Sequence, residues 1–513
     1  MTGSRGARSK SIARFATLTF RDRRPLALGA VSVALLFAGG AAAADLPTKK
    51  APDAPKPSCF DSFQAFLNST PKDCPLTWRG ITLYGVYDVG VGYSSHGANF
   101  NGAYAQGVQE LIAKSSQGAK YQFVPNGLTQ SSVGVKIREE FAPGWAFVGD
   151  ANAAFDPVTL QLANGPQSLV QNNNKTIGNQ NSSSDSSRAG QWDNTRGYVG
   201  LSNTAFGTLT VGRHYSLTND AVSNYDPMGG AYAFSLIGNS STYVSGFGDT
   251  ELARFNTSLK YQVAYNNLRA GALWQFGGYD LGNGSDGAYQ FDLGGDFGGF
   301  SLDGVYSYAR DAVALSAYSA NPLPAGVGLD DLRATLADIK SGLLVGKYTF
   351  GPFQAFGGYE YSRFSPPSDK YPAGFTSLGG YTVLPSGVNT TSYIDNKILQ
   401  VAWVGAKYAI RPDLDVTGAY YYAQQNDYRP AGSAAAVCGP NTKAAVAGAS
   451  PQGTLNTYCA GALNVGSAML DYRPFKRVDL YGGFMYSIAS GGIASGYIHS
   501  NNFAPTAGLR ISF

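Results

Sequence analysis

Regular alternation of apolar and polar residues is the feature that most constrains the fold of this chain. From residue 79 to residue 513 the sequence repeats one unit: an alternating segment of about ten residues, a short turn, a second such segment and a long polar connection. In the final segment, 503–513, apolar side chains occupy one face of an extended strand, and polar or small side chains occupy the other. The two faces of each strand therefore meet two different environments.

The connections between these segments alternate in length. Turns of two to four residues alternate with long polar connections, which are 94–129, 157–190, 217–252, 311–337, 365–393 and 427–461. About sixteen segments result, and short turns at one end with long loops at the other are typical of a transmembrane antiparallel β-barrel. A soluble propeller is not favoured, because the sequence contains no repeated blade motif. We therefore expect an all-β, closed barrel of about sixteen strands.

The expected strands sort their two faces by polarity. In 254–263, apolar residues such as Phe255 share one face, and polar residues such as Lys260 share the other. Lipid must cover the first face and water the second, because a closed barrel is the only sheet whose backbone is fully paired in a membrane. A polar inner face on many strands indicates a wet lumen. Segment 397–409 has apolar residues in both registers, which either a subunit contact or a wrong strand assignment would explain.

The first 44 residues have the composition of a secretory signal. Seven basic residues precede a short apolar run, 25–44, that ends in alanines, and we expect cleavage between Ala44 and Asp45. A transmembrane helix is the alternative, but the run is rich in Gly and Ala and lacks the ~20 strongly apolar residues of a span. The following residues, 45–58, are rich in Pro and Lys and indicate a disordered tether.

Removal of this leader changes the charge of the chain. The full sequence has 38 basic and 34 acidic residues, and without the leader's seven basic and one acidic residue the formal charge becomes −2. Charged residues make up only 14% of the chain, which is well below the ~25% usual in soluble domains. No clustered basic face remains, so we expect no nucleic-acid partner.

The four cysteines fall into two local pairs, Cys59 with Cys74 and Cys438 with Cys459. On an exported chain an even number of cysteines is typical of disulfides, so we expect one bond within each pair, with free thiols as the alternative. The first bond would close a short helical segment within 59–78. No His lies near either pair and the spacing is not that of a zinc site, so we expect no metal and no cofactor.

Several segments resemble the Gram-negative general porin family. The run 196–215, RGYVGLSNTAFGTLTVGRHY, is similar to the strand, turn and strand that precede the third loop of that family. ITLYGVYDVGVGY at 81–93 resembles the first strand, and SSVGVKIREEF at 131–141 resembles the second. The resemblance covers residues 79–513, and the terminal Phe513 matches the aromatic end that such proteins use as an assembly signal.

The resemblance implies a homotrimer of sixteen-stranded barrels in the outer membrane, in contact with outer-membrane lipid and lipopolysaccharide. It also implies that the third loop, 216–252, folds into the lumen and narrows it. The acidic residues of this loop, which would line the constriction, are Asp220, Asp226, Asp249 and Glu251. The basic residues that would face them are Arg196, Arg213, Arg254, Lys136, Arg138 and Lys260.

Arg213 conflicts with the alternation in its own segment. It shares parity with Leu209 and Val211, which should face lipid. A bulge at Gly212, or an early end to the strand, would turn the arginine toward the lumen.

Opposed acidic and basic groups at a narrow section would set a transverse field that favours polar solutes. We therefore expect a passive channel for small hydrophilic solutes and ions, with a substrate-selective porin of the same architecture as the alternative. An outer-membrane enzyme would need a catalytic His from among His96, His214 and His499, but no GxSxG or HExxH motif is present, and we interpret His214 as a pore-mouth residue. A surface adhesin would use 157–190, for which a flexible loop or a trimer latch is the alternative.

Overall fold

The computed structural model describes the chain from residue 58 to residue 513, with gaps. The described residues are 58–97, 110–113, 116, 118–163, 165–175, 195–237, 243–244, 248–249, 252–279, 283–318, 321–369, 376–378, 380–390, 393, 395–428, 459–494 and 497–513. The expected signal peptide, Cys438 and Glu251 lie outside the described residues. The chain divides into two units, Met1–Lys56 and Pro57–Phe513, and all described residues belong to the second.

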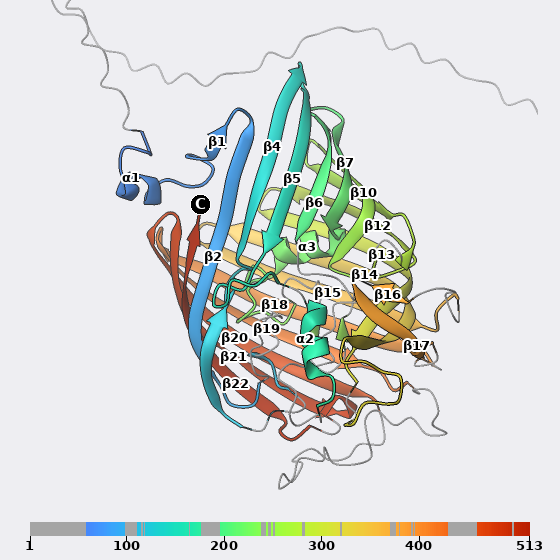
Figure 1. Ribbon diagram of the computed structural model, residues 1–513. Helices are drawn as coiled ribbons and strands as arrows, with labels where there is room; N and C mark the ends of the chain where they lie inside the picture. Colours follow the sequence, from blue (N-terminus) through green and yellow to red (C-terminus); the bar gives the residue numbers. More distant parts are fainter. Residues whose placement is uncertain are drawn as a thin grey trace, which may run out of the picture. The chain divides into compact units, whose positions relative to one another are not determined.

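Sixteen antiparallel strands pair in a closed ring (Figure 1). In ring order they are β2 (Ile81–Ser94), β4 (Ser132–Ala142), β5 (Trp145–Ala154), β6 (Arg196–Asn203), β7 (Gly207–Tyr215), β10 (Arg254–Tyr265), β11 (Leu268–Gln275), β12 (Gly287–Phe297), β13 (Phe300–Ser316), β14 (Asp331–Phe350), β15 (Phe353–Ser365), β18 (Lys397–Arg411), β19 (Leu414–Gln425), β20 (Gly461–Phe475), β21 (Val478–Gly491) and β22 (Asn501–Ser512). The expected all-β, sixteen-stranded antiparallel barrel is confirmed.

The described residues also form shorter strands and helices outside the sixteen-stranded ring. Four strands extend the same sheet: β1 (Leu76–Trp78), β3 (Lys120–Pro125), β16 (Ser377–Leu378) and β17 (Tyr381–Asn389). A separate two-stranded sheet joins β8 (Tyr243–Val244) and β9 (Gly248–Asp249). The helical elements are α1 (Phe63–Leu67), α2 (Gly165–Asn172), α3 (Leu217–Tyr225) and the 3₁₀ turn η6 (Gly492–Ala494).

The two ends of the barrel differ as the connection lengths predict. At the short-turn end, Gly298 (φ 64°) and Gly351 (φ 55°) adopt the left-handed conformation that a tight hairpin needs and that glycine adopts without a steric penalty. The long connections leave from the opposite end, which is the extracellular side in barrels of this kind. The seam closes near the short turns, where Phe513 and Gly85 exchange two backbone hydrogen bonds of 2.9 Å each.

One long connection is much shorter than the sequence suggested. The segment 311–337 was expected to be a loop, but β13 continues to Ser316 and β14 begins at Asp331. At the long-loop end these extensions of β13 and β14 share a small apolar core with Leu169 of α2 and Val383 of β17. Burial of apolar residues against α2 and β17 favours the extended strands, so the loop assignment was wrong.

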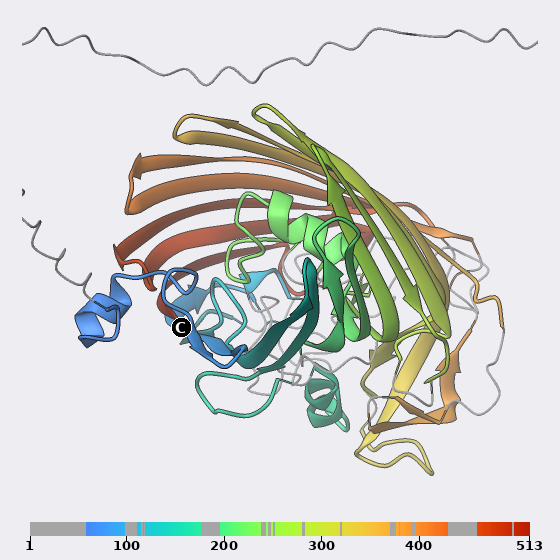
Figure 2. The same ribbon diagram turned by 90° about the horizontal axis from the view of Figure 1, so that it is seen from above.

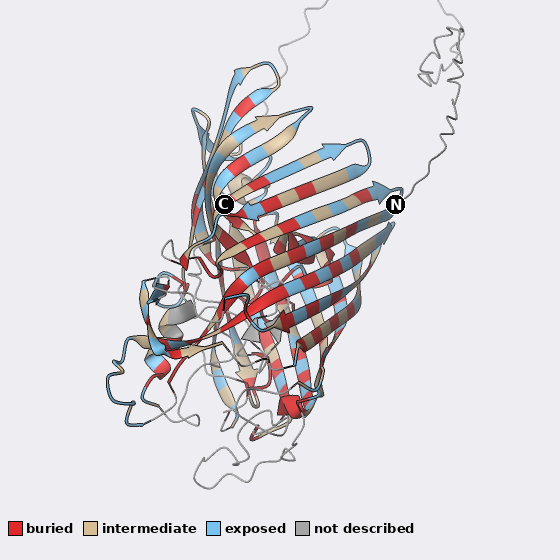
Figure 3. Cartoon of the chain, turned by 90° about the vertical axis from the view of Figure 1, so that its right-hand side faces the viewer, coloured by how far each residue is buried: buried red, intermediate tan, exposed pale blue. Residues whose placement is uncertain are grey.

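The outer face of the barrel carries the apolar residues of the alternating pattern. Figure 3 shows exposed and buried residues alternating along the strands. Large apolar side chains on this face are exposed in the isolated chain; on β4, β6 and β7 they are Val133, Val135, Val199, Leu201, Leu209 and Val211. A band of this kind is the surface that hydrocarbon covers in a transmembrane barrel.

The inner face is divided into two unlike halves. We call the inner face of β2, β4–β7 and β10 the polar wall, and the inner face of β12–β15 and β18–β21 the apolar wall. Residues of the apolar wall belong to a large buried cluster with α3 and the segment 110–113. Beside α3 and segment 110–113 the interior is therefore packed and not wet. Toward the short-turn end the inner faces of β18–β20 are polar again, with the ion pairs Lys407–Asp415 and Arg473–Asp471.

Segment 397–409 belongs to this apolar wall. Leu399, Val401 and Trp403 point inward and are buried in the cluster, whereas Val404 is exposed on the outer face. Both faces of β18 are apolar because one contacts lipid and the other packs against the third loop. Neither a subunit contact nor a wrong strand assignment is needed to explain the sequence pattern.

The N-terminal segment before the barrel is held by a disulfide between Cys59 and Cys74, which confirms the first expected bond. Cys459 is also disulfide-bonded, although its expected partner lies outside the described residues. Ser62 caps α1 by accepting a hydrogen bond from the Ala65 amide. The Arg477 guanidinium, in the β20–β21 turn, donates to the carbonyls of Phe66 and Cys74 and so attaches the segment to the barrel.

No helix among the described residues is long and apolar enough to cross a bilayer.

Candidate pore constriction

The third loop enters the barrel as α3 (Figure 2). Ser216 caps the helix by accepting a hydrogen bond from the Asn219 amide at 3.0 Å. The Leu217 amide donates to Gln290 Oε1 on β12 at 2.6 Å. The apolar side of the helix is buried in the interior cluster. Asp220, in the first turn of the helix, faces the cavity described below.

The far end of α3 is anchored to the apolar wall. Trp403 Nε1 donates to the Tyr225 carbonyl at 3.2 Å, and the Tyr421 hydroxyl donates to Asp226 Oδ1 at 2.6 Å. The Gly230 amide donates to Asp226 Oδ2 at 2.7 Å. Burial raises the pKa of Asp226, while these hydrogen bonds oppose the shift. Asp226 thus fastens the loop and does not line the open cavity described below.

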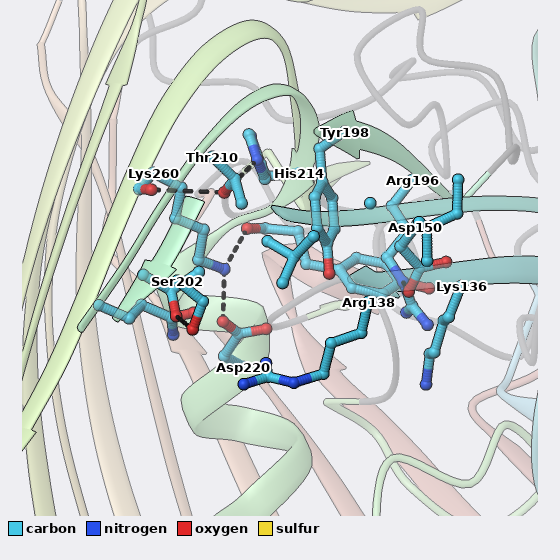
Figure 4. A pocket seen from close by; sticks show the side chains of 16 residues that line it. Lys136, Arg138, Asp150, Arg196, Tyr198, Ser202, Thr210, His214, Asp220 and Lys260 are labelled. Carbon is cyan, nitrogen blue, oxygen red and sulfur yellow. Dashed lines mark hydrogen bonds and ion pairs between the residues drawn. The ribbon is translucent and has the colours of Figure 1, made fainter. Parts of the chain in front are cut away.

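An open cavity of about 440 Å³ lies between α3 and the polar wall (Figure 4). Its charged lining consists of Lys136, Arg138, Asp150, Arg196, Asp220 and Lys260. A second cavity of about 560 Å³ shares Arg196, Tyr215, Asp220 and Gln262 with the first, so the two are adjacent. Together they follow one side of the barrel interior.

A three-residue network organises the wall of this cavity. Arg196 Nε donates to Asp150 Oδ2 at 2.8 Å, and Arg196 Nη2 donates to the Tyr84 hydroxyl at 3.1 Å. The Tyr84 hydroxyl in turn donates to Asp150 Oδ1 at 2.5 Å. Asp150 lies directly opposite Lys136 and Tyr198 on its neighbouring strands, which explains why these side chains meet on one face. The network fixes Asp150 and Arg196 against the wall.

A second ion pair crosses from the wall to the third loop. Lys260 Nζ of β10 lies 2.5 Å from Asp220 Oδ2 of α3, and it also donates to the Tyr215 carbonyl at 2.9 Å. Lys136 and Arg138 extend into the same cavity (Figure 4). Lys136 Nζ lies 4.4 Å from the centre of the Tyr84 ring. Neither residue forms an ion pair with another described residue.

The remaining expected site residues lie elsewhere. Arg254 is fully buried, with its guanidinium carbon 5.1 Å from the Tyr215 ring centre, and it does not line either cavity. Arg213 pairs with Gly197 on the lipid-facing parity and donates to Asn256. Asp249 belongs to β9, and its side chain is outside the description, as is the whole of Glu251.

A bulge in β10 accounts for part of this difference. The register between β10 and β7 shifts between Phe255 and Ser258, and Thr257 has a φ of 45°. One extra residue, with Asn256 and Thr257 opposite Arg213 alone, moves the start of β10 out of phase with its remainder. Phe255, expected on the lipid face, is instead buried in the interior cluster. The bulge lies in β10, whereas the sequence suggested one at Gly212.

The sequence analysis did not identify three tyrosines as site residues. Tyr198 and Tyr215 line the first cavity, and Tyr84 and Tyr215 line the second. In the sequence, nothing distinguished them from other residues on polar strand faces. His214 also lines the first cavity, as expected for a pore-mouth residue. Its two ring nitrogens bond the hydroxyls of Ser258 and Thr210 at 2.8 and 2.9 Å.

One group of carboxylates among the described residues is spaced closely enough to hold a metal ion. It consists of Asp286, Asp311 and Asp369, at the long-loop end of the barrel. Arg310 already lies among them, with Nη2 2.9 Å from Asp369 and Nε 3.3 Å from Asp311. The Arg310 guanidinium offsets one of the three carboxylate charges.

The closed ring, its apolar outer face and the off-centre cavity define a β-barrel channel of the outer membrane. The model of the Gram-negative porin family matches residues 30–492, so the chain belongs to this family, and it is a passive outer-membrane channel. No curated protein sequence matches it significantly.

Solved structures of similar fold include an anion-selective porin from Comamonas acidovorans. It is 14% identical, with a TM-score of 0.52, and the alignment covers 84% of this chain and 99% of that one. A loop-deletion mutant of the outer-membrane protein OmpT of Vibrio cholerae is 11% identical, with a TM-score of 0.50 and coverage of 84% and 99%. At these identities the likeness concerns the fold.

Proposed function

We propose that small hydrophilic solutes cross this barrel along the polar wall, past α3, and that the path favours anions. The observation that carries the proposal is the charge balance of the cavity. Four basic side chains line it against two carboxylates, and each carboxylate is already paired with a cation. Lys136 and Arg138 remain as the basic groups without an acidic partner among the described residues.

Position strengthens the effect of these two charges. They lie on β4 with their side chains exposed to the cavity, whereas the paired groups are held against the wall or the helix. A passing anion meets a net positive section, and a passing cation is repelled there. The solved porin from Comamonas acidovorans is described as anion-selective, and the charge balance here supports the same preference for this chain.

Reversal of both charges tests the proposal. In planar bilayers under a salt gradient, we expect the natural protein to show an anion-preferring reversal potential. The double variant Lys136→Glu with Arg138→Glu changes the charge beside the path by four units. At ~8 Å from a passing ion, this changes the ion's energy by about 2 kcal/mol in water before screening, or its preference by more than tenfold. The potential should therefore reverse its sign.

Lys476→Glu is the matched control, because Lys476 is an exposed residue of the β20–β21 turn, outside the cavity. Its reversal potential should match that of the natural protein. An unchanged potential in the double variant, or an equal change in the control, would refute an anion-preferring path beside β4.

We also propose a homotrimer, as the resemblance to general porins implies. The same recordings should then show conductance rising in groups of three equal steps, since each barrel would conduct independently. Single isolated steps from well-folded protein would contradict the trimer and leave the charge argument intact.

Catalysis is not part of the proposed function. Both ring nitrogens of His214 are bonded to hydroxyls, and no described carboxylate accepts a hydrogen bond from it to complete a catalytic triad. His499 stacks on His96, with ring centres 3.7 Å apart. For the connection 157–190, packing of Leu169 on the chain's own β13–β14 extension supports a role within the barrel over one as an adhesin.

A further inference from the structure

The two adjacent cavities beside α3 differ in chemistry. Their volumes, about 440 Å³ for the first and about 560 Å³ for the second, lie in the range of sites that hold small molecules. Among the described residues that line the second cavity, only Arg196 and Asp220 are charged, and both also line the first. Apart from Val86, the other side chains of the second cavity carry hydroxyl or amide groups. A charged section of the path therefore adjoins an uncharged, hydrogen-bonding one.

The uncharged cavity lies on the extracellular side of the charged one. On β4, Ser132 lines the second cavity, whereas Lys136 and Arg138, further toward the short turns, line the first. β5 runs in the opposite direction and shows the same order, with Asn152 at the second cavity and Asp150 at the first. A solute that enters from outside thus meets amides and hydroxyls before it meets the basic side chains of β4.

Some of the amides at the second cavity are available to a solute. Gln262 of β10 and Asn224 of α3 are exposed in the isolated chain, and neither side chain forms a hydrogen bond with another described residue. Asn219, also on α3, is 4% exposed, and its Oδ1 accepts no hydrogen bond within the described part of the chain. A buried acceptor without a donor is costly, so a hydroxyl group beside it is favoured.

Such a lining favours solutes that carry several hydroxyl groups. Each hydroxyl both donates and accepts, as the amides do, so it replaces the hydrogen bonds of the water that it displaces. An aliphatic solute displaces the same water without replacing those bonds. A neutral sugar would suit the second cavity but would leave Lys136 and Arg138 unused, and an aliphatic acid would do the reverse.

We propose that, among the solutes that pass, sugar acids are held most strongly, with their hydroxyl groups in the second cavity and their carboxylate toward Lys136 and Arg138. This inference rests on the anion-preferring path proposed above and adds what the rest of the anion must carry. A carboxylate suits passage better than a phosphate, because a dianion held by two cations would leave slowly, and conduction requires release as well as binding.

Block of the chloride current through single channels tests the inference, with full-length, folded protein in planar bilayers and each solute added to both sides. Gluconate is the probe. Hexanoate has the same charge and number of carbon atoms without the added hydroxyl groups, and glucose has hydroxyl groups without the charge. We expect gluconate to reach half-block at about a tenfold lower concentration than either of the other two, which is the effect of one or two additional hydrogen bonds or of one attracted charge.

Substitution of the available amides identifies the site. Gln262→Met removes one amide and nearly keeps the size of the side chain, so the ratio of the half-blocking concentrations of hexanoate and gluconate should fall about threefold. The double variant Gln262→Met with Asn224→Leu should bring this ratio close to one. Gln354→Met is the matched control, because Gln354 pairs with Lys407 on the inner face of β15 and lines neither cavity. The control should keep the ratio of the natural protein. Stepwise conductance in chloride alone establishes that each variant is folded.

Equal block of the natural protein by gluconate and hexanoate would overturn the inference, and so would an equal fall of the ratio in Gln354→Met. Block by glucose at the same concentration as gluconate would also overturn it, because the carboxylate would then contribute nothing. The reversal potential separates this inference from the proposed function. Equal block by the two anions together with an anion-preferring potential refutes the sugar-acid preference alone, whereas a potential without anion preference refutes the proposed function itself.

Discussion

The polar wall and the apolar wall belong to one ring of strands, yet at the level of α3 their inner faces differ in chemistry. The polar wall presents ion pairs, tyrosines and an open cavity. The apolar wall presents a buried cluster that continues into α3. An antiparallel strand has only two faces, so a strand that contacts lipid outside and packed protein inside must be apolar on both. At the level of α3 the barrel therefore joins a wet sheet to one that resembles a soluble protein core. Toward the short-turn end the apolar wall carries ion pairs as well, Lys407–Asp415 and Arg473–Asp471.

This difference determines where the path runs. The third loop packs against the apolar wall through Tyr225 and Trp403, and it presents Asp220 to the polar wall. The loop thus fills one half of the interior and leaves the other half open. The position of the aqueous path follows from which wall offers the loop an apolar surface.

The largest effect should come from removing the anchor on the apolar wall. Trp403 is 4% exposed in the interior cluster, and Trp403→Ala should lower the free energy of unfolding by about 3–5 kcal/mol, as in a soluble core. Urea unfolding in lipid vesicles measures this loss. Bilayer recordings should also show noisier conductance, because the Trp403 hydrogen bond to the third loop is lost.

Val404→Ala, one residue along the same strand, is the control. Val404 is 59% exposed on the outer face, and its truncation should cost about 0.5 kcal/mol or less. Equal losses from the two variants would mean that the apolar wall is not packed as a core, and the contrast between the walls would fail.

Much of this arrangement could be predicted from the sequence, and the failures have physical causes. Alternation placed Lys136, Arg138, Arg196 and Lys260 on inner faces, because a two-residue period survives along any regular strand. It failed at Phe255, because a bulge changes the phase of a strand without a clear signature in the sequence.

Alternation also cannot reveal what covers a face. The anchoring of Asp226 by Tyr421 joins residues that are 195 apart in the sequence, so the loop's contact with β19 was not visible. An acidic residue in a loop that enters a lumen can line the path or fasten the loop. Only the partner distinguishes the two roles, and the partner comes from tertiary structure.

A pH-dependent effect of intermediate size should arise on the packed side of the interior. Glu110 precedes Leu111 and Ile112, which belong to the interior cluster, and it is itself 2% exposed with both carboxylate oxygens lacking a hydrogen-bond donor among the described residues. Burial raises the pKa of Glu110 to about 8. The folded protein therefore holds this proton to a higher pH than the unfolded chain, and its free energy of unfolding should fall as pH rises between these two pKa values.

Between about pH 6 and about pH 7.5 the loss should be about 2 kcal/mol, since one proton is bound in the folded state and none in the unfolded state. Glu110→Gln should remove this part of the slope. Glu139→Gln, which changes an exposed carboxylate of β4, should leave the slope as it is. A slope unaffected by Glu110→Gln would mean that the segment is not buried against the apolar wall.

The smallest expected effect concerns the polar wall. Tyr84→Phe removes one donor to Asp150 and one acceptor for Arg196, and should cost about 1 kcal/mol of stability. Tyr87→Phe is the matched change on the outer face of the same strand, where the hydroxyl donates to the Pro157 carbonyl at 2.8 Å, and it should cost a similar amount. Only Tyr84→Phe should alter the reversal potential, by a small shift toward cations, because Asp150 loses a donor that partly neutralises it beside the cavity. If both hydroxyl deletions left selectivity untouched, the network on β2, β5 and β6 would be structural alone and the ion preference would have to arise from Lys136 and Arg138 without it.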